Sequence, residues 1–373
     1  MFQKPFFSGK EAYLENEKKY YPSYYREIER ASRQIGGIGK DPEIVVAVPV
    51  HTIEPSIKDL LRCYQHQDYD RAKYRIILFI NGNSKNSDCS HLLREVDYAK
   101  NLGLPVTVLK KTFEKKITMG YIRKFLCDSI LLRFRDSNLI IVNNDADLEE
   151  LESVYLREVS TAASNKTKKI FYRLVSFSRQ YAQYPCFCML TTLNRDFDEE
   201  YNRLNDDRLP IRVHNYNLIF SADTYAHLGG YCASVDVGED LTLAYYASNI
   251  FSKSCFLRLQ SHIIPSARRY VFAYVNDIPI YRAWDDFENL KVRTIREAQQ
   301  HELLSHKEKR VSNQYFEHEV LEFYSHVLDR RFKPYISDHF EATRLCDKVF
   351  SAIISRKTKL TPSRHLSRTW SDR

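Results

Sequence analysis

The sequence predicts an α/β protein built on a mostly parallel sheet with helices on both faces. Four short apolar runs suit strands buried on both faces, and three helical patterns separate them. The predicted strands are 43–50, 75–82, 104–110 and 138–144, and the predicted helices are 55–67, 88–102 and 118–134. Such alternation is typical of parallel sheets, whose ligands bind beyond the carboxyl ends of the strands. We therefore expect the site in the loops after Val50, Ile80 and Val142.

The second half of the chain is less regular. Further strands are predicted at 168–178, 211–223 and 255–265, and further helices at 222–228 and 240–250. From about 284 to 330 the chain is charged and helical in pattern. We expect an N-terminal helical extension (1–40), a main domain (41–283, with halves 41–150 and 151–283), a helical C-terminal region (284–354) and a flexible tail (355–373).

Composition excludes several classes of protein. Hydrophobic residues make up 43% and charged residues 28% of the 373, which excludes wholesale disorder. No run of apolar residues is long enough for a spanning helix, and the opening residues lack the apolar core of a secretory signal. The eight cysteines form no CxxC pair and are expected as reduced thiols. These features predict a cytoplasmic protein.

The net charge of +8 is concentrated at the C-terminus. A basic tail of this kind is most simply a solvated end, and it also suits peripheral contact with anionic lipid at the inner face of a membrane. Only Trp370 offers an aromatic ring there, too little for a platform that stacks single-stranded nucleic acid. We therefore expect no nucleic-acid partner.

The sharpest local feature is an acidic pair, Asp145 and Asp147, directly after the fourth predicted strand. In an extended chain, residues two apart point the same way, so both carboxylates would converge at the edge of the sheet. Mg²⁺ and Mn²⁺ prefer oxygen ligands, and Mg²⁺ is often held by one or two carboxylates plus substrate phosphates. Alternatively, Asp147 caps a helix that begins at Leu148.

The second feature is a glycine-containing segment that is followed in the sequence by two acidic residues. Gly229, Gly230 and Tyr231 precede Glu239 and Asp240, and local enrichment in a chain with only ten glycines indicates tight turns or close backbone approach. The two acids open a predicted helix. They suit either an acidic helix start, favoured by the helix dipole, or a general base.

Five sequence motifs follow one another over about residues 43–265: VAVPV, INGN, a G-x-x-R helix start, DAD, and GGY followed by GED. These motifs and their order resemble those of GT-A glycosyltransferases, particularly family 2. The resemblance implies a Rossmann-like nucleotide-binding sheet and a hexosyltransferase that takes a nucleotide-diphosphate sugar. A UDP-sugar is favoured and a GDP-sugar is the next choice, with a carbohydrate, lipid-linked or protein acceptor left open.

The resemblance also implies roles for single residues. The residues that would contact the nucleotide are Val48, Pro49, His51, Asn81, Gly120 and Arg123. Asn81 stands where family members often carry an acid, which leaves the base unspecified. Asp145 and Asp147 would hold Mn²⁺ or Mg²⁺ and the diphosphate. Asp240 would be the catalytic base with Glu239 beside it, and Gly229, Gly230 and Tyr231 would shape the acceptor or sugar floor.

Two further candidates are each open to a second interpretation. His262 matches a place from which some GT-A enzymes supply a third metal ligand, and its apolar neighbours equally suit a structural histidine. Arg268 and Arg269 suit either a bidentate clamp on the diphosphate or a solvent-facing basic pair.

Two other functions compete with glycosyl transfer. A nucleotidyltransferase of sugar phosphates shares the half-sheet and the acidic ligands, but it usually has a Gly-rich loop after the first strand, and 51–58 contains no glycine. A catalytically degenerate GT-A interaction protein is the third possibility. The sequence has no GxxxxGK[ST] or GxGxxG motif, which disfavours P-loop and dinucleotide enzymes.

Overall fold

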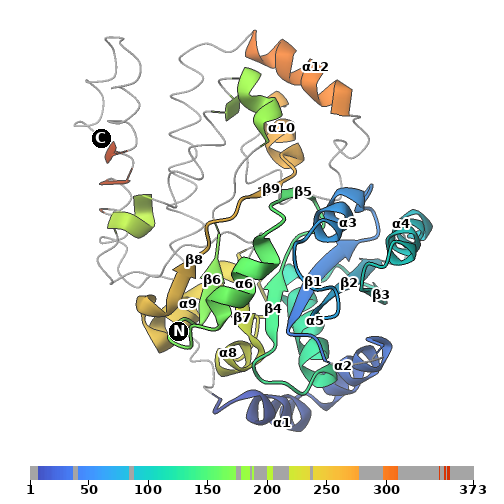
Figure 1. Ribbon diagram of the computed structural model, residues 1–373, viewed down its shortest axis with the longest axis vertical. Coiled ribbons are helices and arrows are strands. Elements are labelled where there is room, and N and C mark those ends of the chain that lie inside the picture. The colour runs from blue at the N-terminus through green and yellow to red at the C-terminus, as the bar shows by residue number, and fades with distance from the viewer. Residues whose placement is uncertain are drawn as a thin grey trace. The chain divides into compact units, whose positions relative to one another are not determined.

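The computed structural model describes residues 7–36, 41–83, 88–173, 178–184, 187–188, 200–204, 218–235, 238–276, 297–309, 344, 348–349 and 351–352. Figure 1 shows the arrangement of their helices and strands. The basic tail, most of the expected C-terminal helical region and the first six residues lie outside the described residues.

The strands confirm the predicted α/β class. Seven of them form one sheet in the order β3-β2-β1-β4-β7-β6-β8, and two form a small second sheet. The strands are β1 Ile44–His51, β2 Tyr74–Asn83, β3 Val106–Phe113, β4 Ile140–Asn143, β5 Leu148–Leu151, β6 Ile170–Tyr172, β7 Ile219–Ser221, β8 Phe256–Arg258 and β9 Ile263–Pro265.

Helices connect and cover these strands. They are α1 Lys10–Tyr20, α2 Pro22–Gln34, α3 Lys58–Gln65, α4 Ser90–Asn101, α5 Met119–Arg133, α6 Tyr155–Ala163, α8 Ala222–His227, α9 Glu239–Phe251, α10 Arg268–Val275 and α12 Glu297–Glu308. Short 3₁₀ turns lie at η1 Arg179–Gln183 and η3 Lys253–Cys255.

The order of the strands creates a switch point between β1 and β4. Both pair in parallel, as do β1 with β2 and β2 with β3, whereas β7 runs antiparallel to β4 and β6. After β1 the chain moves outward through β2 to β3, and α5 then returns it to β4 on the opposite side of β1. In open sheets of this kind, ligands bind beyond the carboxyl ends of the strands at the switch point.

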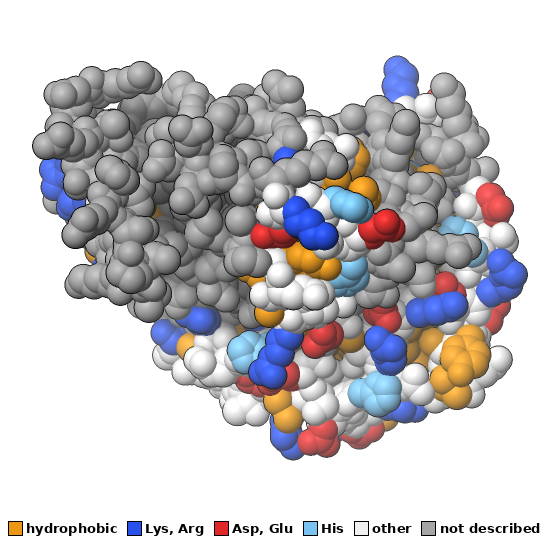
Figure 2. All heavy atoms as spheres, turned by 90° about the horizontal axis from the view of Figure 1, so that it is seen from above, with side chains coloured by type: hydrophobic (Ala, Val, Ile, Leu, Met, Phe, Trp, Pro, Cys, Tyr) orange, Lys and Arg blue, Asp and Glu red, His pale blue; other side chains and the backbone are white. Residues whose placement is uncertain are grey.

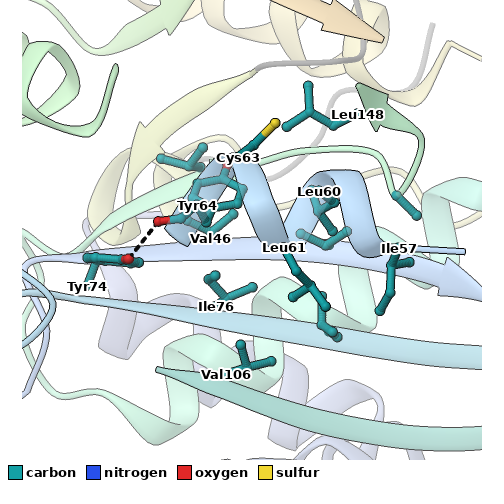
Figure 3. Close-up of a cluster of buried hydrophobic side chains, with 14 of the residues drawn as sticks. Val46, Ile57, Leu60, Leu61, Cys63, Tyr64, Tyr74, Ile76, Val106 and Leu148 are labelled. Atoms are coloured by element: carbon teal, nitrogen blue, oxygen red, sulfur yellow. Dashed lines mark hydrogen bonds between the residues drawn. The ribbon is translucent and has the colours of Figure 1, made fainter. Parts of the chain in front are cut away.

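Alternate residues of the central strands pack on opposite faces of the sheet. Val46 of β1 and Ile76 of β2 belong to a buried cluster that α3 covers with Leu60, Leu61 and Tyr64 (Figure 3). Figure 3 also shows the Tyr74 hydroxyl donating a hydrogen bond to the Tyr64 carbonyl at 3.0 Å. A period of two on a strand separates the layers in this way.

The other face of the sheet is packed by α5. Phe79 of β2 stacks on Phe125 of α5 with ring centroids 5.2 Å apart. Because Phe79 alternates with Ile76, Leu78 and Ile80 of the first cluster, its strand is buried on both sides. The apolar runs without alternation are explained by this burial.

The N-terminal helices are held by one buried carboxylate on α5. Asp128 is fully buried and accepts hydrogen bonds from the hydroxyls of Tyr13 (2.9 Å), Tyr24 (2.7 Å) and Tyr225 (3.0 Å). Lys124, one turn earlier, donates to it at 2.8 Å. Helices α1 and α2 thus pack beside α5 and α8 as part of the sheet unit (Figure 1).

Two segments differ from the prediction. Residues 148–151 form β5 rather than the start of a helix, because Leu148 is buried in the core cluster and the segment pairs with β9. The predicted strand 255–265 is two strands in different sheets. The carboxylate of Glu158 accepts hydrogen bonds from the backbone N–H groups of Gln260 and Ser261, which interrupts the ladder between them.

Contacts divide the chain into two compact units. The first comprises 1–178 and 213–266, and the second 179–212 and 267–373. The six cysteines at 63, 89, 127, 188, 232 and 255 are free thiols. Among the described helices, none has both the length and the apolar character needed to cross a bilayer.

We predict that Asp128→Asn destabilises the protein by about 3–5 kcal/mol, because it removes the charge that faces Lys124 and places an amide donor among three hydroxyl donors. Urea unfolding followed by circular dichroism measures the change. The matched control is Asp59→Asn, which breaks an exposed 2.8 Å pair with Arg62 and should change stability by no more than about 0.5 kcal/mol. Equal effects of the two substitutions would contradict the assignment of Asp128 as the anchor.

Candidate functional site

The candidate site lies at the carboxyl edge of the sheet, on either side of the switch point. His51 ends β1, Asn81 lies near the end of β2, and Asp145 follows β4. The parallel pairing of β1 with both neighbours brings these three ends to one edge. This is the edge predicted from the sequence.

Two buried amides lock the end of β4. Asn143 donates through its side chain to the Leu218 carbonyl at 3.1 Å, and the backbone N–H of Asn144 donates to the Ala47 carbonyl at 3.1 Å. The Asn144 side chain also donates to the Tyr64 hydroxyl. Because both asparagines are held from several sides, the residue that follows leaves the sheet in a defined direction. Neither asparagine was expected at the site from the sequence, although two polar residues at the end of an apolar strand were a usable signal.

The acidic pair lies in a turn rather than in an extended segment. The backbone turns at 146–147 before β5 begins, and side chains two residues apart point the same way only in an extended chain. The expected shared direction of Asp145 and Asp147 therefore does not follow. Asp145 keeps 20% of its side chain exposed and Asp147 is buried. The backbone carbonyl of Asp147 accepts from Ser266 at 2.7 Å, which ties the turn to the end of β9. Asp147 does not cap a helix, because a strand follows it.

Arg123 joins the acidic pair to the second acidic motif. Its Nε–H donates to the Glu239 carboxylate at 2.8 Å, and one terminal nitrogen donates to the Asp145 carboxylate. Arg123 and Glu239 are 2% and 1% exposed. Burial alone lowers the pKa of the guanidinium, but the carboxylates of Asp145 and Glu239 outweigh it and raise that pKa above its ordinary value. The structure therefore brings together three residues that lie in separate motifs.

The contacts of Arg123 with Asp145 and Glu239 require the start of α5 to approach another backbone segment closely, and Gly120 allows this. A Cβ at Gly120 would lie 2.1 Å from the carbonyl oxygen of Cys232 and 2.7 Å from that of Val235. The Gly120 N–H donates to Val235 at 2.9 Å, and the Thr118 hydroxyl, which caps α5, donates to the Ala233 carbonyl. Only a residue without a side chain lets the start of α5 reach this loop.

Glu239 and Asp240 begin α9 and are both buried. Gly238 precedes them in the left-handed conformation (φ 86°), which glycine adopts without strain. Burial, and then the neighbouring charge of Glu239, raise the pKa of Asp240 well above its ordinary value. Burial also raises the pKa of Glu239, although Arg123 opposes that rise. A carboxyl with a raised pKa suits proton transfer near neutral pH.

The expected nucleotide contacts are more deeply buried than the acids. Val48 is part of the core cluster and Pro49 is buried in β1. Asn81 is 4% exposed, and its side chain donates to the carbonyls of Val50 (3.1 Å) and Phe79 (3.2 Å). His51 is partly exposed, and its Nδ1 accepts from the Ile53 N–H at 3.2 Å. Of these four, His51 alone has side-chain surface at the edge.

The Gly-Gly-Tyr segment faces the N-terminal helix. A Cβ on Gly230 would lie 2.6 Å from the Tyr13 hydroxyl oxygen and 2.8 Å from that of Tyr225. Gly229 and Gly230 both have positive φ, 71° and 69°, which explains the paired glycines. Tyr231 is 1% exposed, and burial raises the pKa of its hydroxyl well above its ordinary value.

The structure does not bring His262 to the acidic pair. In the two-stranded sheet of β5 and β9, His262 lies opposite Glu152, whereas Ser266 lies opposite Asp147 at the other end. His262 is exposed, and its Nε2 lies 3.7 Å from the Glu152 carboxylate. Arg268 begins α10 in the second unit and is partly buried, and the side chain of Arg269 lies outside the described part of the chain.

The oxygen atoms of Asp145 and Asp147 are of the kind that bind hard divalent cations. Asp145 and Asp147 supply carboxylate oxygens at one turn, as Mg²⁺ and Mn²⁺ prefer, and such cations commonly take further ligands from substrate phosphates. Among the described residues, no group of three or more His, Cys, Asp or Glu side chains is placed to hold a metal by itself.

Figure 2 shows one face of the molecule with its described side chains coloured by type. Lysine and arginine, acidic side chains and histidine are intermingled over the part of this face that the structure describes. Neither sign of charge forms a continuous patch there. Within that part, the face lacks the basic stripe typical of nucleic-acid-binding surfaces.

No protein-family model matches the sequence, and no curated protein matches it significantly. Solved structures do match. A mannosyltransferase from Pyrobaculum calidifontis, in complex with GDP-Man and Mn²⁺, is 14% identical with a TM-score of 0.42, over 94% of this chain and 100% of its own. Residues 1–349 of S. aureus TarS, in complex with UDP, are 12% identical with a TM-score of 0.41, over 88% and 94%.

Glucosyl-3-phosphoglycerate synthase from Mycobacterium tuberculosis, in complex with phosphoglyceric acid, is 12% identical with a TM-score of 0.33, over 64% of this chain and 73% of its own. In fold, this chain is similar to GT-A glycosyltransferases. Because the identities and TM-scores are low, the function proposed below rests on this chain's own residues.

We predict that Gly120→Ala destabilises the protein, although alanine is favoured over glycine in a helix by about 1 kcal/mol. The added Cβ would overlap two backbone carbonyls that have no flexible side chain to move. Thermal unfolding measures the change. Gly36→Ala is the control, because a Cβ there meets nothing within 4 Å. An unchanged or raised melting temperature for Gly120→Ala would show that α5 does not depend on this close approach.

Proposed function

We propose that this protein is a metal-dependent glycosyltransferase. It moves a hexose from a nucleotide-diphosphate sugar, UDP-linked by preference and GDP-linked otherwise, to an acceptor hydroxyl with inversion. The observation that supports this most is the meeting of two acidic motifs at the switch point of a mostly parallel sheet. Asp145 and Asp147 follow β4, Glu239 and Asp240 begin α9, and Arg123 links the two.

The first motif is proposed as the donor side. Asp145 and Asp147 would hold Mn²⁺ or Mg²⁺ together with the diphosphate. A cation bound there stabilises the negative charge that develops on a departing nucleoside diphosphate. By holding that cation, the two carboxylates would place the diphosphate at the carboxyl edge, beside the partly exposed His51, where ligands of such sheets bind.

The second motif is proposed as the acceptor side. Asp240 accepts the proton of the acceptor hydroxyl while that oxygen attacks the anomeric carbon. Its buried position raises its pKa, so transfer should increase with pH as the carboxyl ionises, since only the carboxylate can take a proton. One carboxylate base opposite the leaving group supports single displacement, hence inversion.

A nucleotidyltransferase is less well supported. Such an enzyme would use the first loop to surround the phosphates, and 51–58 has no glycine for close backbone approach. A non-catalytic role is less well supported as well. Burying Glu239 and Asp240, with one guanidinium paired to Glu239 and Asp145, is costly, and a binding scaffold without chemistry would not require it.

Asp147→Ala is expected to weaken binding of UDP in the presence of Mn²⁺. The loss should exceed the roughly 10–100-fold seen when a residue that merely supports a metal ligand is changed. Isothermal calorimetry with and without Mn²⁺ measures it. Asp136→Ala, an exposed acid before the opposite end of β4, is the matched control and should bind as the wild type does. Unchanged metal-dependent binding by Asp147→Ala would refute the donor-side assignment.

Asp240→Asn is expected to lower kcat for transfer by about 10²–10⁴, the usual contribution of a general base, because an amide does not accept the acceptor's proton. Binding of UDP with Mn²⁺ should stay within about twofold, a loss of less than about 0.5 kcal/mol. Transfer is measured over a panel of UDP- and GDP-sugars.

The control is Asp223→Asn, an acid in the first turn of the neighbouring helix α8, which should transfer at the wild-type rate. If Asp240→Asn retained wild-type transfer, Asp240 would not be the base. If the wild type neither bound nor hydrolysed any nucleotide sugar, the interaction-protein alternative would be favoured.

A further inference from the structure

The guanidinium of Arg123 is the point where the two acidic motifs meet. Asp145 comes from the first half of the chain and Glu239 lies 116 residues beyond Arg123, yet each accepts a hydrogen bond from a different nitrogen of this side chain. The contact to Glu239 is 2.8 Å. Arg123 therefore sets the distance between the end of β4 and the start of α9.

The hydrogen bonds from Arg123 to Asp145 and Glu239 form a bridge between the two acidic motifs. On the Glu239 side, further contacts join α5 to the segment that leads into α9. Gly120 and Thr118 donate hydrogen bonds from the start of α5 to Val235 and Ala233, and Val235 lies three positions before Gly238, the residue that precedes α9. The side chain of Arg123 then reaches Glu239, the first residue of that helix. Because backbone and side-chain contacts act on the same segment, the position of α9 depends on α5.

The bridge leaves Arg123 poorly suited to bind a nucleotide. Its side chain is 2% exposed, and two of its three nitrogens already donate to carboxylates. Clamping a diphosphate requires a pair of accessible N–H groups in parallel. Only the third nitrogen, Nη1, has no hydrogen-bond partner among the described residues, and it is buried, so a bidentate contact with a diphosphate would compete with at least one of the two ion pairs.

Loss of the bridge would be strongly destabilising, because it would leave a buried carboxylate without its ion-pair partner. Glu239 is 1% exposed, and an uncompensated carboxylate in that position would be strongly unfavourable. Arg123 also lowers the pKa of Asp240, against the larger raising effects of burial and of Glu239. One residue therefore holds the Glu239 carboxyl in place next to Asp240.

We propose that Arg123 is a positioning residue that couples the donor-side carboxylate Asp145 to the acceptor-side pair Glu239–Asp240, and that it is not a nucleotide ligand. This rests on the proposed function. Arg123 holds the start of α9 at a fixed distance from the DAD turn, so that Asp240 faces the bound donor. A displacement of about 1 Å at such a position costs on the order of a hundredfold in rate.

The test is Arg123→Lys, which retains the charge but has one nitrogen in place of the planar fork that reaches both carboxylates. We expect kcat for transfer to fall by about tenfold to a hundredfold, while KM for the donor changes less than about threefold. Affinity for UDP without metal should stay within about twofold, because the guanidinium offers the nucleotide almost no surface. A tenfold loss of metal-free UDP affinity, or an unchanged kcat, would overturn the proposal.

The matched control is Arg133→Lys. Arg133 lies at the other end of the same helix, where its Nε–H donates to the Ile35 carbonyl at 2.7 Å. This variant tests the general effect of replacing a partly buried arginine on α5, and its kcat should equal that of the wild type. An equal fall in kcat for both variants would show that Arg123 acts only through the stability of α5.

A thermodynamic cycle tests the bridge without any substrate. Arg123→Met and Glu239→Gln are made singly and together, and the melting temperature of each is measured. The double variant should melt higher than the sum of the two single effects predicts, since neither partner is then left buried alone. Additive effects would overturn the bridge even if the protein proved to be an active transferase.

The two proposals fail in different ways. A wild type that binds no nucleotide would refute the glycosyltransferase, and a non-additive cycle would still establish the bridge as a structural link. A wild type that transfers sugar, combined with Arg123→Lys at the wild-type kcat, would refute the coupling alone. Should Arg123→Lys fail to fold, Glu239→Gln takes its place, with the same expected fall in kcat at unchanged metal-free UDP affinity.

Discussion

The architecture of the candidate site depends on one electrostatic constraint, the burial of several carboxylates beside a single arginine. Asp145 and Asp147 end the first half of the sheet, and Glu239 and Asp240 begin α9. Like charges at this spacing repel, and burial strengthens the repulsion because little water screens it. The guanidinium of Arg123 offsets it through two hydrogen bonds. Without that guanidinium the two acidic motifs would not be stable at their present separation.

Helix α5 serves two regions of the molecule at once. Arg123 extends from its first turns toward the acidic motifs, and Asp128, little more than a turn later, collects three tyrosine hydroxyls from α1, α2 and α8. Gly230 also lies against the Tyr13 hydroxyl. The N-terminal helices, which look like an appendage in the sequence, thus support the helix that carries Arg123. Their packing and the geometry of the site share one structural element.

Local sequence patterns were sufficient to predict a helix or strand where the segment is buried on both faces. The strands β1, β2 and β4 and the helix α5 were predictable because Val, Ile and Leu runs and helical periodicity report burial directly. The alternative helix beginning at Leu148 was wrong, and the single strand predicted at 255–265 is two strands; both segments are short and carry weak periodicity. There, pairing with β9 and the hydrogen bonds from the backbone of Gln260 and Ser261 to Glu158 determine the conformation. Those contacts join residues that are far apart in the chain, so no local window contains them.

The sequence by itself determined the α/β alternation, the edge at which polar residues gather and the kind of chemistry their carboxylates suit, because these follow from residue type and nearest-neighbour pattern. The tertiary structure determined which residues share that edge. It turned Arg123 toward Asp145 and Glu239, buried Asn81 against β1, placed Gly230 beside Tyr13 and put His262 at the far end of the two-stranded sheet from Asp147. Each of these depends on the packing of elements distant in sequence, which is settled by shape and buried charge rather than by periodicity.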